Sequence, residues 1–140
     1  MQIRYISLDS SLPNLAIAHP GDAGFDLYAR VDTTLEPGKW VGVPSGVIFE
    51  IPDGYVGLIW DKSGLSIRNG LKTLGGVVDS GYRGEVLIGM INLGPEPYTF
   101  KKGEKVAQML IQKVEHPEFI QVEQLTDTTR GTDGFGSTGK

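Results

Sequence analysis

The residues best suited to chemistry lie in a glycine-rich segment, residues 75–85, where Asp79 and Tyr82 are close together. A carboxylate can activate a water molecule, and an exposed tyrosine ring can pack on a sugar or a base. Glycines surround the pair, and glycine lets another molecule approach the backbone closely. The segment is also typical of a β-hairpin that bends at residues 79–81, because hairpin turns favour Asp and Gly. The pattern therefore supports both a catalytic and a purely structural interpretation.

Two further segments offer groups that can bind an anion. Lys62, Ser63 and Gly64 follow a predicted strand and lead into a predicted short helix around residues 64–68. Such a junction presents backbone N–H groups, a hydroxyl and an ammonium to a phosphate, although serine is also a common helix cap. Gln108 lies among apolar residues of a predicted strand, and a buried amide needs hydrogen-bond partners. A hydrogen bond within the sheet explains Gln108 as well as a ligand contact does.

A pair of acids and the C-terminal tail complete the candidates. Asp22 and Asp26 flank a turn of small residues, and Asp22 could equally cap a turn, which is its more common role. From residue 126 the chain is rich in Thr and Gly, which favours a disordered tail. The alternative is a tail that orders only over a ligand, because it combines a cation for phosphate, a ring for stacking and hydroxyls. These side chains are Arg130, Phe135, Ser137 and Thr138.

The elements that must position these residues are predicted to be short β-strands. Apolar residues alternate most clearly along residues 46–51, 55–60, 85–92 and 105–111. In the third of these, Val86, Ile88 and Met90 occupy one side and Leu87 and Ile91 the other, which predicts burial on both faces. Short strands separated by Gly and Pro indicate an all-β sandwich or barrel. A chain of 140 residues is enough for one domain.

Composition excludes several kinds of site. Without cysteine there is no disulfide, thiolate metal site or cysteine nucleophile. His19 and His116 are the only histidines, which nearly excludes an imidazole-based zinc site. The formal net charge of −4 does not favour binding to nucleic acid or an anionic membrane. No apolar segment approaches a membrane span and no signal peptide is visible, so we expect a soluble, cytoplasmic protein.

Taken in order, five segments of the chain resemble the five motifs of the homotrimeric, all-β deoxyuridine triphosphatase (dUTPase) family. They read AGFDLYA, DKSGLS, GVVDSGYRGE, GEKVAQML and RGTDGFGSTG, and they extend over nearly the whole chain. The resemblance implies a distorted jelly-roll-like β-barrel of short strands with one short helix. It also implies a nucleotide-hydrolase barrel over residues 1–125 and a flexible C-terminal lid over residues 126–140. The implied activity is Mg²⁺-dependent hydrolysis of dUTP to dUMP and pyrophosphate, which keeps uracil out of DNA and supplies dUMP for thymidylate synthesis.

The resemblance implies roles for the motif residues as well. Asp79 would activate the water that attacks the α-phosphorus, Tyr82 would pack under the deoxyribose and leave no room for a 2′-hydroxyl, and Asp26 would hold Mg²⁺ through water. Backbone groups of residues 73–81 would pair with uracil, with contacts at Thr73, Gly76 and Val78. The phosphates would be bound by Lys62, Ser63, Gly64 and Gln108. The lid would close with Arg130 on the γ-phosphate, Phe135 over uracil, and Gly136, Ser137 and Thr138 beside them. In this family each site draws on three subunits, and the tail reaches a neighbour's site.

The chain departs from the usual pattern of this family at several motif positions. Lys62 replaces the usual Arg, which loses a bidentate fork, and Asp61 replaces the usual Pro, which adds an acid that pairing with a base would neutralise. Gly81 and Asp133 are also departures, and the charge of Asp133 could alter lid closure. Two alternative functions remain. One is a related dCTP deaminase, alone or bifunctional, with Glu85 as the nearest acid, and the other is a nucleotide-responsive regulatory module.

Overall fold

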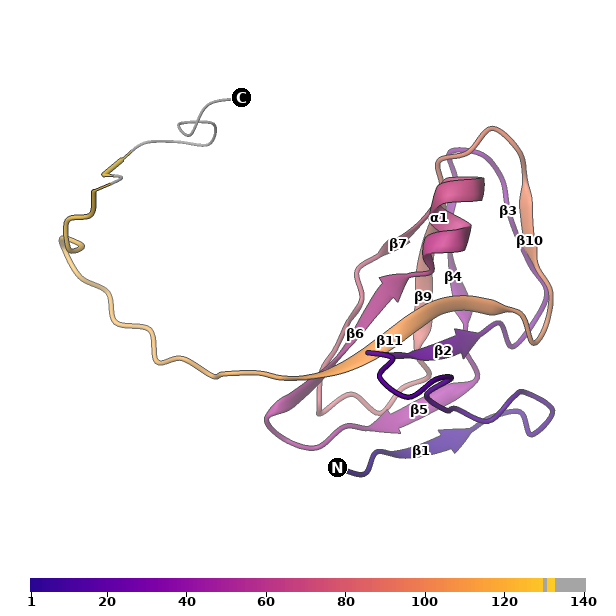
Figure 1. Ribbon diagram of the computed structural model, residues 1–140, viewed down its shortest axis with the longest axis horizontal. Helices are drawn as coiled ribbons and strands as arrows, with labels where there is room; N and C mark the ends of the chain where they lie inside the picture. Colours follow the sequence, from indigo (N-terminus) through magenta and orange to yellow (C-terminus); the bar gives the residue numbers. More distant parts are fainter. Residues whose placement is uncertain (130, 133–140) are drawn as a thin grey trace.

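The structure, a computed structural model, describes residues 1–129, 131 and 132 of the chain. Within these residues, short strands and one short helix follow one another as shown in Figure 1. This confirms the prediction of an all-β fold with a single helix. The elements are β1 (Arg4–Ser7), β2 (Phe25–Tyr28), β3 (Thr33–Leu35), β4 (Trp40–Pro44), β5 (Val47–Glu50), β6 (Tyr55–Asp61), α1 (Ser63–Asn69), β7 (Leu71–Leu74), β8 (Val77–Val78), β9 (Leu87–Asn92), β10 (Tyr98–Phe100) and β11 (Lys105–Lys113).

The strands form several small antiparallel sheets. The largest has the order β2-β11-β6-β8, a second has the order β4-β9-β7, and β1-β5 and β3-β10 form pairs. Neighbours in sequence are often not neighbours in a sheet: β5 and β6 are joined by a turn at residues 52–54 but belong to different sheets. The long strand β11 crosses the body of the molecule (Figure 1) and pairs with both β2 and β6. It therefore brings the first, second and fourth motifs together.

Burial along β9 follows the predicted alternation on one face only. Val86, Ile88 and Met90 are buried in the core, as predicted. Leu87, however, is 58% exposed, so the prediction of burial on both faces is wrong for this residue. The reason is the place of β9 in the β4-β9-β7 sheet, whose second face is not covered by another element in the described part of the chain. On that face Trp40 of β4 is 74% exposed and lies opposite Ile91.

The glycine-rich segment bends where predicted, but its arms are different. The Tyr82 N–H donates to the Asp79 carbonyl at 3.1 Å, which confirms a turn at residues 79–82. The antiparallel arms are β7 and β9, and β8 pairs with β6 instead. Gly75 and Gly76 have φ values of 69° and 111°, and these left-handed conformations turn the chain from one sheet to the other. The segment is thus a long loop between two strands that touches a third.

The helix is present as predicted and ends at a glycine. Gly70 has a φ of 69°, and its N–H bonds back to carbonyls of the last turn. No residue of α1 is fully buried. Among the described residues, no helix is long and apolar enough to cross a membrane.

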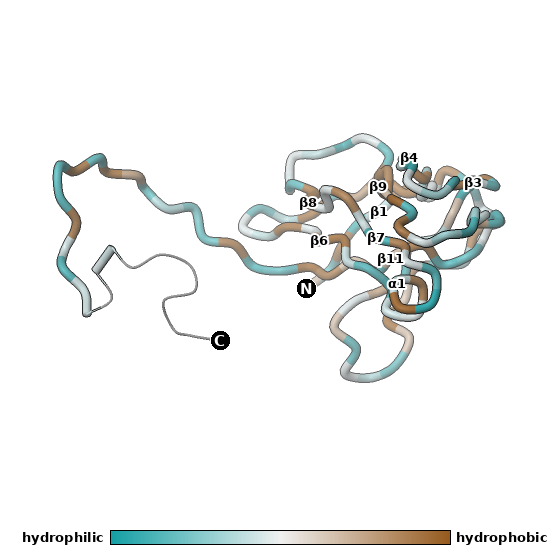
Figure 2. The backbone as a smooth tube through the Cα atoms, turned by 90° about the horizontal axis from the view of Figure 1, so that it is seen from above, coloured by the Kyte–Doolittle hydropathy of each residue, from teal (hydrophilic) through white to brown (hydrophobic). Residues whose placement is uncertain are grey.

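After β11 the chain leaves the body as an extended arm, residues 114–129, which has neither helix nor strand. Figure 2 shows hydrophobic positions along this arm. Phe119, Ile120 and Leu125 are 91%, 75% and 86% exposed. Apolar side chains of this size are normally covered, so the arm has the character of a contact surface. The boundary at residue 125 stays a prediction, and the predicted lid residues Arg130, Phe135, Gly136, Ser137 and Thr138 lie outside the described residues.

Candidate functional site

Asp79 and Tyr82 lie together at one cavity, which we call the loop cavity. Its volume is about 210 Å³. Asp79 is exposed, and the Tyr82 side chain is 46% exposed while its hydroxyl donates to the Glu85 carbonyl at 2.9 Å. The hydroxyl contact therefore holds the ring in place, while nearly half of the residue stays exposed. The lining residues are Ile59, Gly76, Val77, Val78, Asp79, Tyr82, Val86 and Leu87.

The loop cavity owes its shape to Gly76. The Gly76 carbonyl accepts a hydrogen bond from the Ile59 N–H at 2.7 Å. A Cβ at this position would lie 2.8 Å from the Ile59 carbonyl oxygen, in a backbone conformation that other residues rarely adopt. Only glycine lets the loop lie this close to β6. The predicted contacts Gly76 and Val78 thus lie at the same cavity as the predicted catalytic acid.

Glu85, the acid considered for a deaminase, is bound to other groups. One carboxylate oxygen accepts from Arg30 at 2.9 Å and the other from the Gly46 N–H at 2.8 Å. Its side chain is only 19% exposed. A carboxylate held in this way joins the loop to the body and is not free to move protons at the loop cavity.

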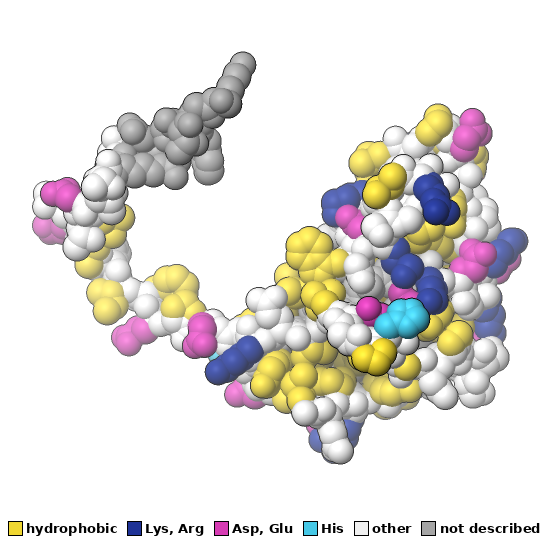
Figure 3. All heavy atoms as spheres, viewed as in Figure 1, with side chains coloured by type: hydrophobic (Ala, Val, Ile, Leu, Met, Phe, Trp, Pro, Cys, Tyr) yellow, Lys and Arg dark blue, Asp and Glu magenta, His cyan; other side chains and the backbone are white. Residues whose placement is uncertain are grey.

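A second cavity, which we call the polar cavity, is lined by charged and polar groups from the first, second and fourth motifs. Its volume is about 320 Å³. Asp26 accepts from Lys62 at 2.5 Å through one oxygen and from Lys105 at 2.7 Å through the other. Figure 3 shows basic, acidic and histidine side chains gathered on one face of the body. The lining residues are Ala18, His19, Asp22, Ala23, Gly24, Asp26, Lys62, Lys105 and Gln108.

The two lysines keep Asp26 ionised. Burial favours its neutral form, but the hydrogen bonds from Lys105 and Lys62 outweigh burial, so the pKa of Asp26 lies below its usual value. The same contact raises the pKa of Lys105. The cluster of one carboxylate and two ammonium groups therefore carries a net positive charge at neutral pH, which suits an anion.

The wall of the polar cavity is a capped turn. The Asp22 carboxylate accepts from the His19 N–H at 3.0 Å, which confirms the predicted capping role. Gly24 follows, and a Cβ there would lie 2.7 Å from the Met109 carbonyl oxygen. The segment that follows the turn therefore packs directly against β11, next to Gln108.

Gln108 and Thr73 are both tied to Asp61. The Gln108 amide donates to the Asp61 carbonyl at 3.0 Å, which leaves its amide oxygen for a ligand. The Asp61 carboxylate accepts from the Thr73 N–H and hydroxyl, each at 2.7 Å, and from Lys72 at 2.8 Å. Asp61 is thus paired with a base, as predicted. Because the Thr73 N–H is used here, the carbonyl is the backbone group that Thr73 can still offer to uracil.

The remaining phosphate candidates lie at the start of α1. Ser63 and Gly64 are exposed, directly after Lys62, which caps the helix without a side-chain hydrogen bond. Both residues come directly after Lys62, which lines the polar cavity, but neither of them lines it.

The loop cavity and the polar cavity have no lining residue in common. Asp79 and Tyr82 belong to the first, and Asp26, Lys62 and Gln108 to the second. Within the described part of one copy, the predicted catalytic acid and the predicted phosphate groups are therefore not in the same cavity.

The described residues offer little to a metal ion on their own. No three His, Cys, Asp or Glu side chains gather among them as a metal site. Asp26 is a carboxylate of the polar cavity, and each of its oxygens keeps a lone pair beyond its lysine contact. Mg²⁺ commonly keeps several waters and takes one or two carboxylates together with substrate phosphates. The donor set therefore fits Mg²⁺ that arrives with a polyphosphate.

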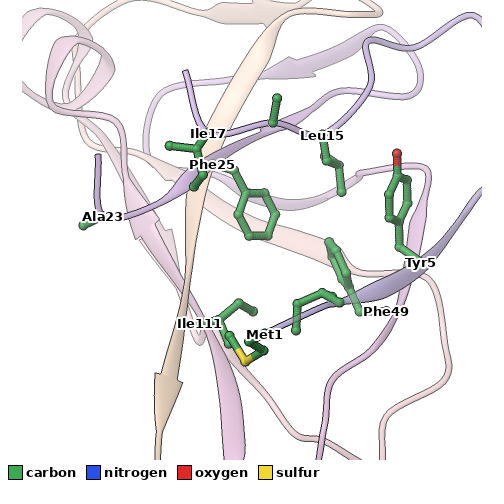
Figure 4. Close-up of a pocket in the computed structure, with 10 residues that line it drawn as sticks. Met1, Tyr5, Leu15, Ile17, Ala23, Phe25, Phe49 and Ile111 are labelled. Carbon is green, nitrogen blue, oxygen red and sulfur yellow. The ribbon is translucent and has the colours of Figure 1, made fainter. Parts of the chain in front are cut away.

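Two features of this region were missed by sequence reasoning. One is Lys105, the first residue of the predicted strand in the fourth motif, which lines the polar cavity. The other is an apolar groove of about 380 Å³, where side chains of β1, β2, β5 and β11 point toward one hollow (Figure 4). It has no charged lining residue and so offers packing rather than chemistry. The groove is lined by Met1, Ile3, Tyr5, Leu15, Ala16, Ile17, Ala23, Phe25, Phe49 and Ile111.

Comparison with known proteins gives consistent matches over most of the chain. A family model described as dUTPase matches residues 11–139. The chain is 46% identical over 142 residues to a deoxyuridine 5′-triphosphate nucleotidohydrolase of Mycolicibacterium vanbaalenii, covering 96% of this chain and 92% of that protein. It is 45% identical over 141 residues to the protein of the same name from Corynebacterium glutamicum, covering 99% and 95%.

Among solved structures, the dUTPase of Staphylococcus bacteriophage 80alpha with dUPNHPP matches with a TM-score of 0.92 and 28% identity, covering 99% of each chain. A mutant dUTPase from phage phi11 of S. aureus, described with a structural Mg(II) ion, matches with a TM-score of 0.82 and 27% identity, covering 89% of this chain and 98% of that one.

Proposed function

The chain belongs to the dUTPase family and hydrolyses deoxyuridine 5′-triphosphate, and we propose that it does so by attack of a water molecule, activated by Asp79, on the α-phosphorus. The observation that carries the proposal is Asp79 and Tyr82 at one open cavity built on Gly76. An exposed carboxylate there can take a proton from water, and the reaction needs no covalent nucleophile. The products are dUMP and pyrophosphate.

Uracil is read by the loop cavity. Cytosine differs from uracil by an exchange of donor and acceptor on its pairing edge, so fixed backbone groups of residues 73–81 accept one and leave polar atoms unpaired with the other. The methyl group of thymine is excluded by the narrow, glycine-shaped loop. Tyr82 packs under the deoxyribose, where a 2′-hydroxyl has no room.

The triphosphate is bound by the polar cavity. Lys62 supplies charge, Gln108 supplies an amide, and Ser63 and Gly64 supply a hydroxyl and backbone N–H groups at the start of α1. Asp26 would hold Mg²⁺ through water, and the ion would supply positive charge that neutralises part of the phosphate charge. The lysine ammonium is a point charge, so it orients phosphate oxygens less strictly than an arginine fork.

Since the acid and the cations lie at different cavities, we propose that a complete site forms between copies in a homotrimer. The uncovered face of the β4-β9-β7 sheet, with Trp40, Leu74 and Leu87 exposed, supports association. The extended arm, residues 114–129, supports a tail that reaches a neighbouring copy. Residues 126–140 then form a lid over the bound nucleotide.

We also propose a cytoplasmic enzyme that keeps uracil out of DNA and supplies dUMP for thymidylate synthesis. With a net charge of −4, the protein is suited to a metal-bound nucleotide more than to nucleic acid or an anionic membrane.

The first test compares pyrophosphate release from dUTP, dTTP, dCTP and UTP at equal concentration, with and without Mg²⁺. Rapid release from dUTP alone is expected, and only with the metal. Equal turnover of UTP would contradict the role of Tyr82, and ammonia released from dCTP would favour the deaminase. Asp79→Asn is expected to abolish turnover while nucleotide affinity, measured by calorimetry, is kept. Near-normal turnover would place the base elsewhere.

Shared sites can be tested by complementation. Asp79→Asn and Lys62→Met chains are each expected to be inactive, because each lacks one half of the site. When the two are refolded together at equal amounts, random assembly gives about a quarter of the sites an intact acid and an intact lysine. Recovered turnover of that order supports sites made between copies. No recovery, with mixed trimers present, would mean that each copy holds its own complete site.

The lid is tested by ending the chain at residue 129. The shortened protein is expected to keep its fold and its association state, measured by circular dichroism and sedimentation, and to lose most of its turnover. Unchanged turnover would identify the tail as a linker and would favour other roles for it, including a regulatory one.

A further inference from the structure

Lys105 reaches the polar cavity because β11 contains an irregularity just after it. We propose that Lys105 is a further phosphate-binding residue, which works with Lys62 as a lysine pair spaced by Asp26. The proposal rests on the proposed function, since it assigns a role in binding the triphosphate of that substrate.

The register of β11 is what places Lys105 on this side of the strand. Along β11 the partners on β2 shift between Lys105 and Ala107, so two steps on β11 correspond to one step on β2. Strict alternation would put residues 105 and 108 on opposite faces. The bulge removes this conflict, since Val106 and Ala107 are both fully buried while Lys105 and Gln108 both line the polar cavity.

The contact with Asp26 positions both ammonium groups without using them up. Asp26 is 11% exposed and bonds Lys62 and Lys105 through different oxygens, at 2.5 and 2.7 Å. Each ammonium group has three N–H donors, so one donor of each goes to Asp26 and two remain for a ligand. The lysine side chains are 29% and 50% exposed, so they are accessible from the cavity.

The neighbouring acid does not compete for these lysines. Asp22 lines the same cavity, but its carboxylate accepts from the His19 N–H. The cavity therefore holds two ammonium groups and two carboxylates, but only Asp26 is in contact with the lysines, beside the Gln108 amide. Two lysines held on one carboxylate present two separated cationic donors to a polyphosphate. A single arginine can bind phosphate in a similar way, because its guanidinium offers two parallel N–H donors.

The test separates phosphate binding from structural support for the β2–β11 pairing. Binding of inorganic tripolyphosphate and of deoxyuridine is measured by calorimetry on the full chain, for the natural protein, Lys105→Met and Lys105→Arg. The KM and kcat for dUTP are measured alongside. Lys101→Met is the matched control, because Lys101 is also paired with an aspartate, Asp32, but does not line the cavity.

We expect Lys105→Met to weaken tripolyphosphate binding by about tenfold and to raise the KM for dUTP by a similar factor, with deoxyuridine binding unchanged. Lys105→Arg should restore most of the tripolyphosphate affinity, and Lys101→Met should change neither ligand. Unchanged tripolyphosphate binding in Lys105→Met, or an equal loss for both ligands that Lys105→Arg does not restore, would overturn the proposal. If the natural protein failed to hydrolyse dUTP, the proposed function would fall, and the tripolyphosphate comparison would still decide the role of Lys105.

Discussion

Replacing Asp61 with alanine should show how much the contact between the end of β6 and β7 contributes to the free energy of unfolding. Asp61 ends β6 and its carboxylate accepts from the Thr73 N–H and hydroxyl at 2.7 Å and from Lys72 at 2.8 Å. Thr73 is only 8% exposed, and it lies on β7, which leads into the loop cavity. Asp61→Ala therefore removes the acceptor of two donors on a buried residue.

The size of the effect follows from those two donors. A buried donor left without a partner costs about 1–3 kcal/mol, and a water molecule entering the space left by the carboxylate would recover part of this. The Lys72 contact adds little, because that side chain is half exposed. We expect Asp61→Ala to lower the free energy of unfolding by about 2–4 kcal/mol.

The assay is urea unfolding at pH 7 and fixed protein concentration, since the proposed association of copies would also contribute to stability. Asp32→Ala is the matched control, because Asp32 accepts from a lysine ammonium, Lys101, and from the backbone N–H of Lys102, all at exposed positions. Its loss should cost less than about 1 kcal/mol. If Asp61→Ala were no more destabilising than Asp32→Ala, burial of Thr73 would not govern the strength of this contact.

Three further predictions concern acidity, the loop and the metal. Because the pKa values of Asp26 and Asp61 lie below the usual 3.8, their contribution to stability is complete above that value and is lost as the pH falls below it. Urea midpoints should therefore drop on acidification below about pH 4, and less steeply in Asp61→Asn. Gly76→Ala should destabilise the protein by about 2 kcal/mol or more and abolish uracil discrimination, because its Cβ would lie 2.8 Å from the Ile59 carbonyl oxygen. Gly75→Ala, with open space around its Cβ, should cost about 1 kcal/mol, so equal effects would refute the steric argument. Chelation with EDTA should stop turnover without changing the circular dichroism spectrum, and added Mg²⁺ should restore it; loss of the fold on chelation would indicate a structural ion instead.

Local patterns in the sequence were sufficient to predict the main strands, the helix and the turn at residues 79–82. Burial of Val86, Ile88 and Met90 follows from alternation, and the turn at residues 79–82 follows from its Asp and Gly content. Capping by Asp22 follows from the same preference. Each of these depends on residues only a few positions apart, which is the range over which sequence patterns carry direct physical meaning.

The pairing of strands required information that no local pattern contains. β8 pairs with β6 and not with a strand of its own hairpin, because two left-handed glycines redirect the chain. The bulge in β11 could not be predicted either, because the sequence of residues 105–111 looks like that of a regular strand. Lys105 was therefore overlooked, although it lies in a recognised motif. The exposure of Leu87 likewise depends on which face of its sheet has no cover, and this is a property of the packed chain.

The two cavities contain different chemical groups, which agrees with the proposed sites between copies. The loop cavity contains a free carboxylate but no lysine or arginine among its lining residues. The polar cavity contains two lysines, but its two carboxylates are both engaged, Asp26 by the lysines and Asp22 by a backbone N–H. Had Asp79 been beside the lysine pair in one copy, an ion pair would have made its carboxylate a weaker base and taken ammonium donors away from phosphate. In the proposed trimer, this separation leaves the Asp79 carboxylate free to accept a proton from water and leaves the ammonium groups available for phosphate.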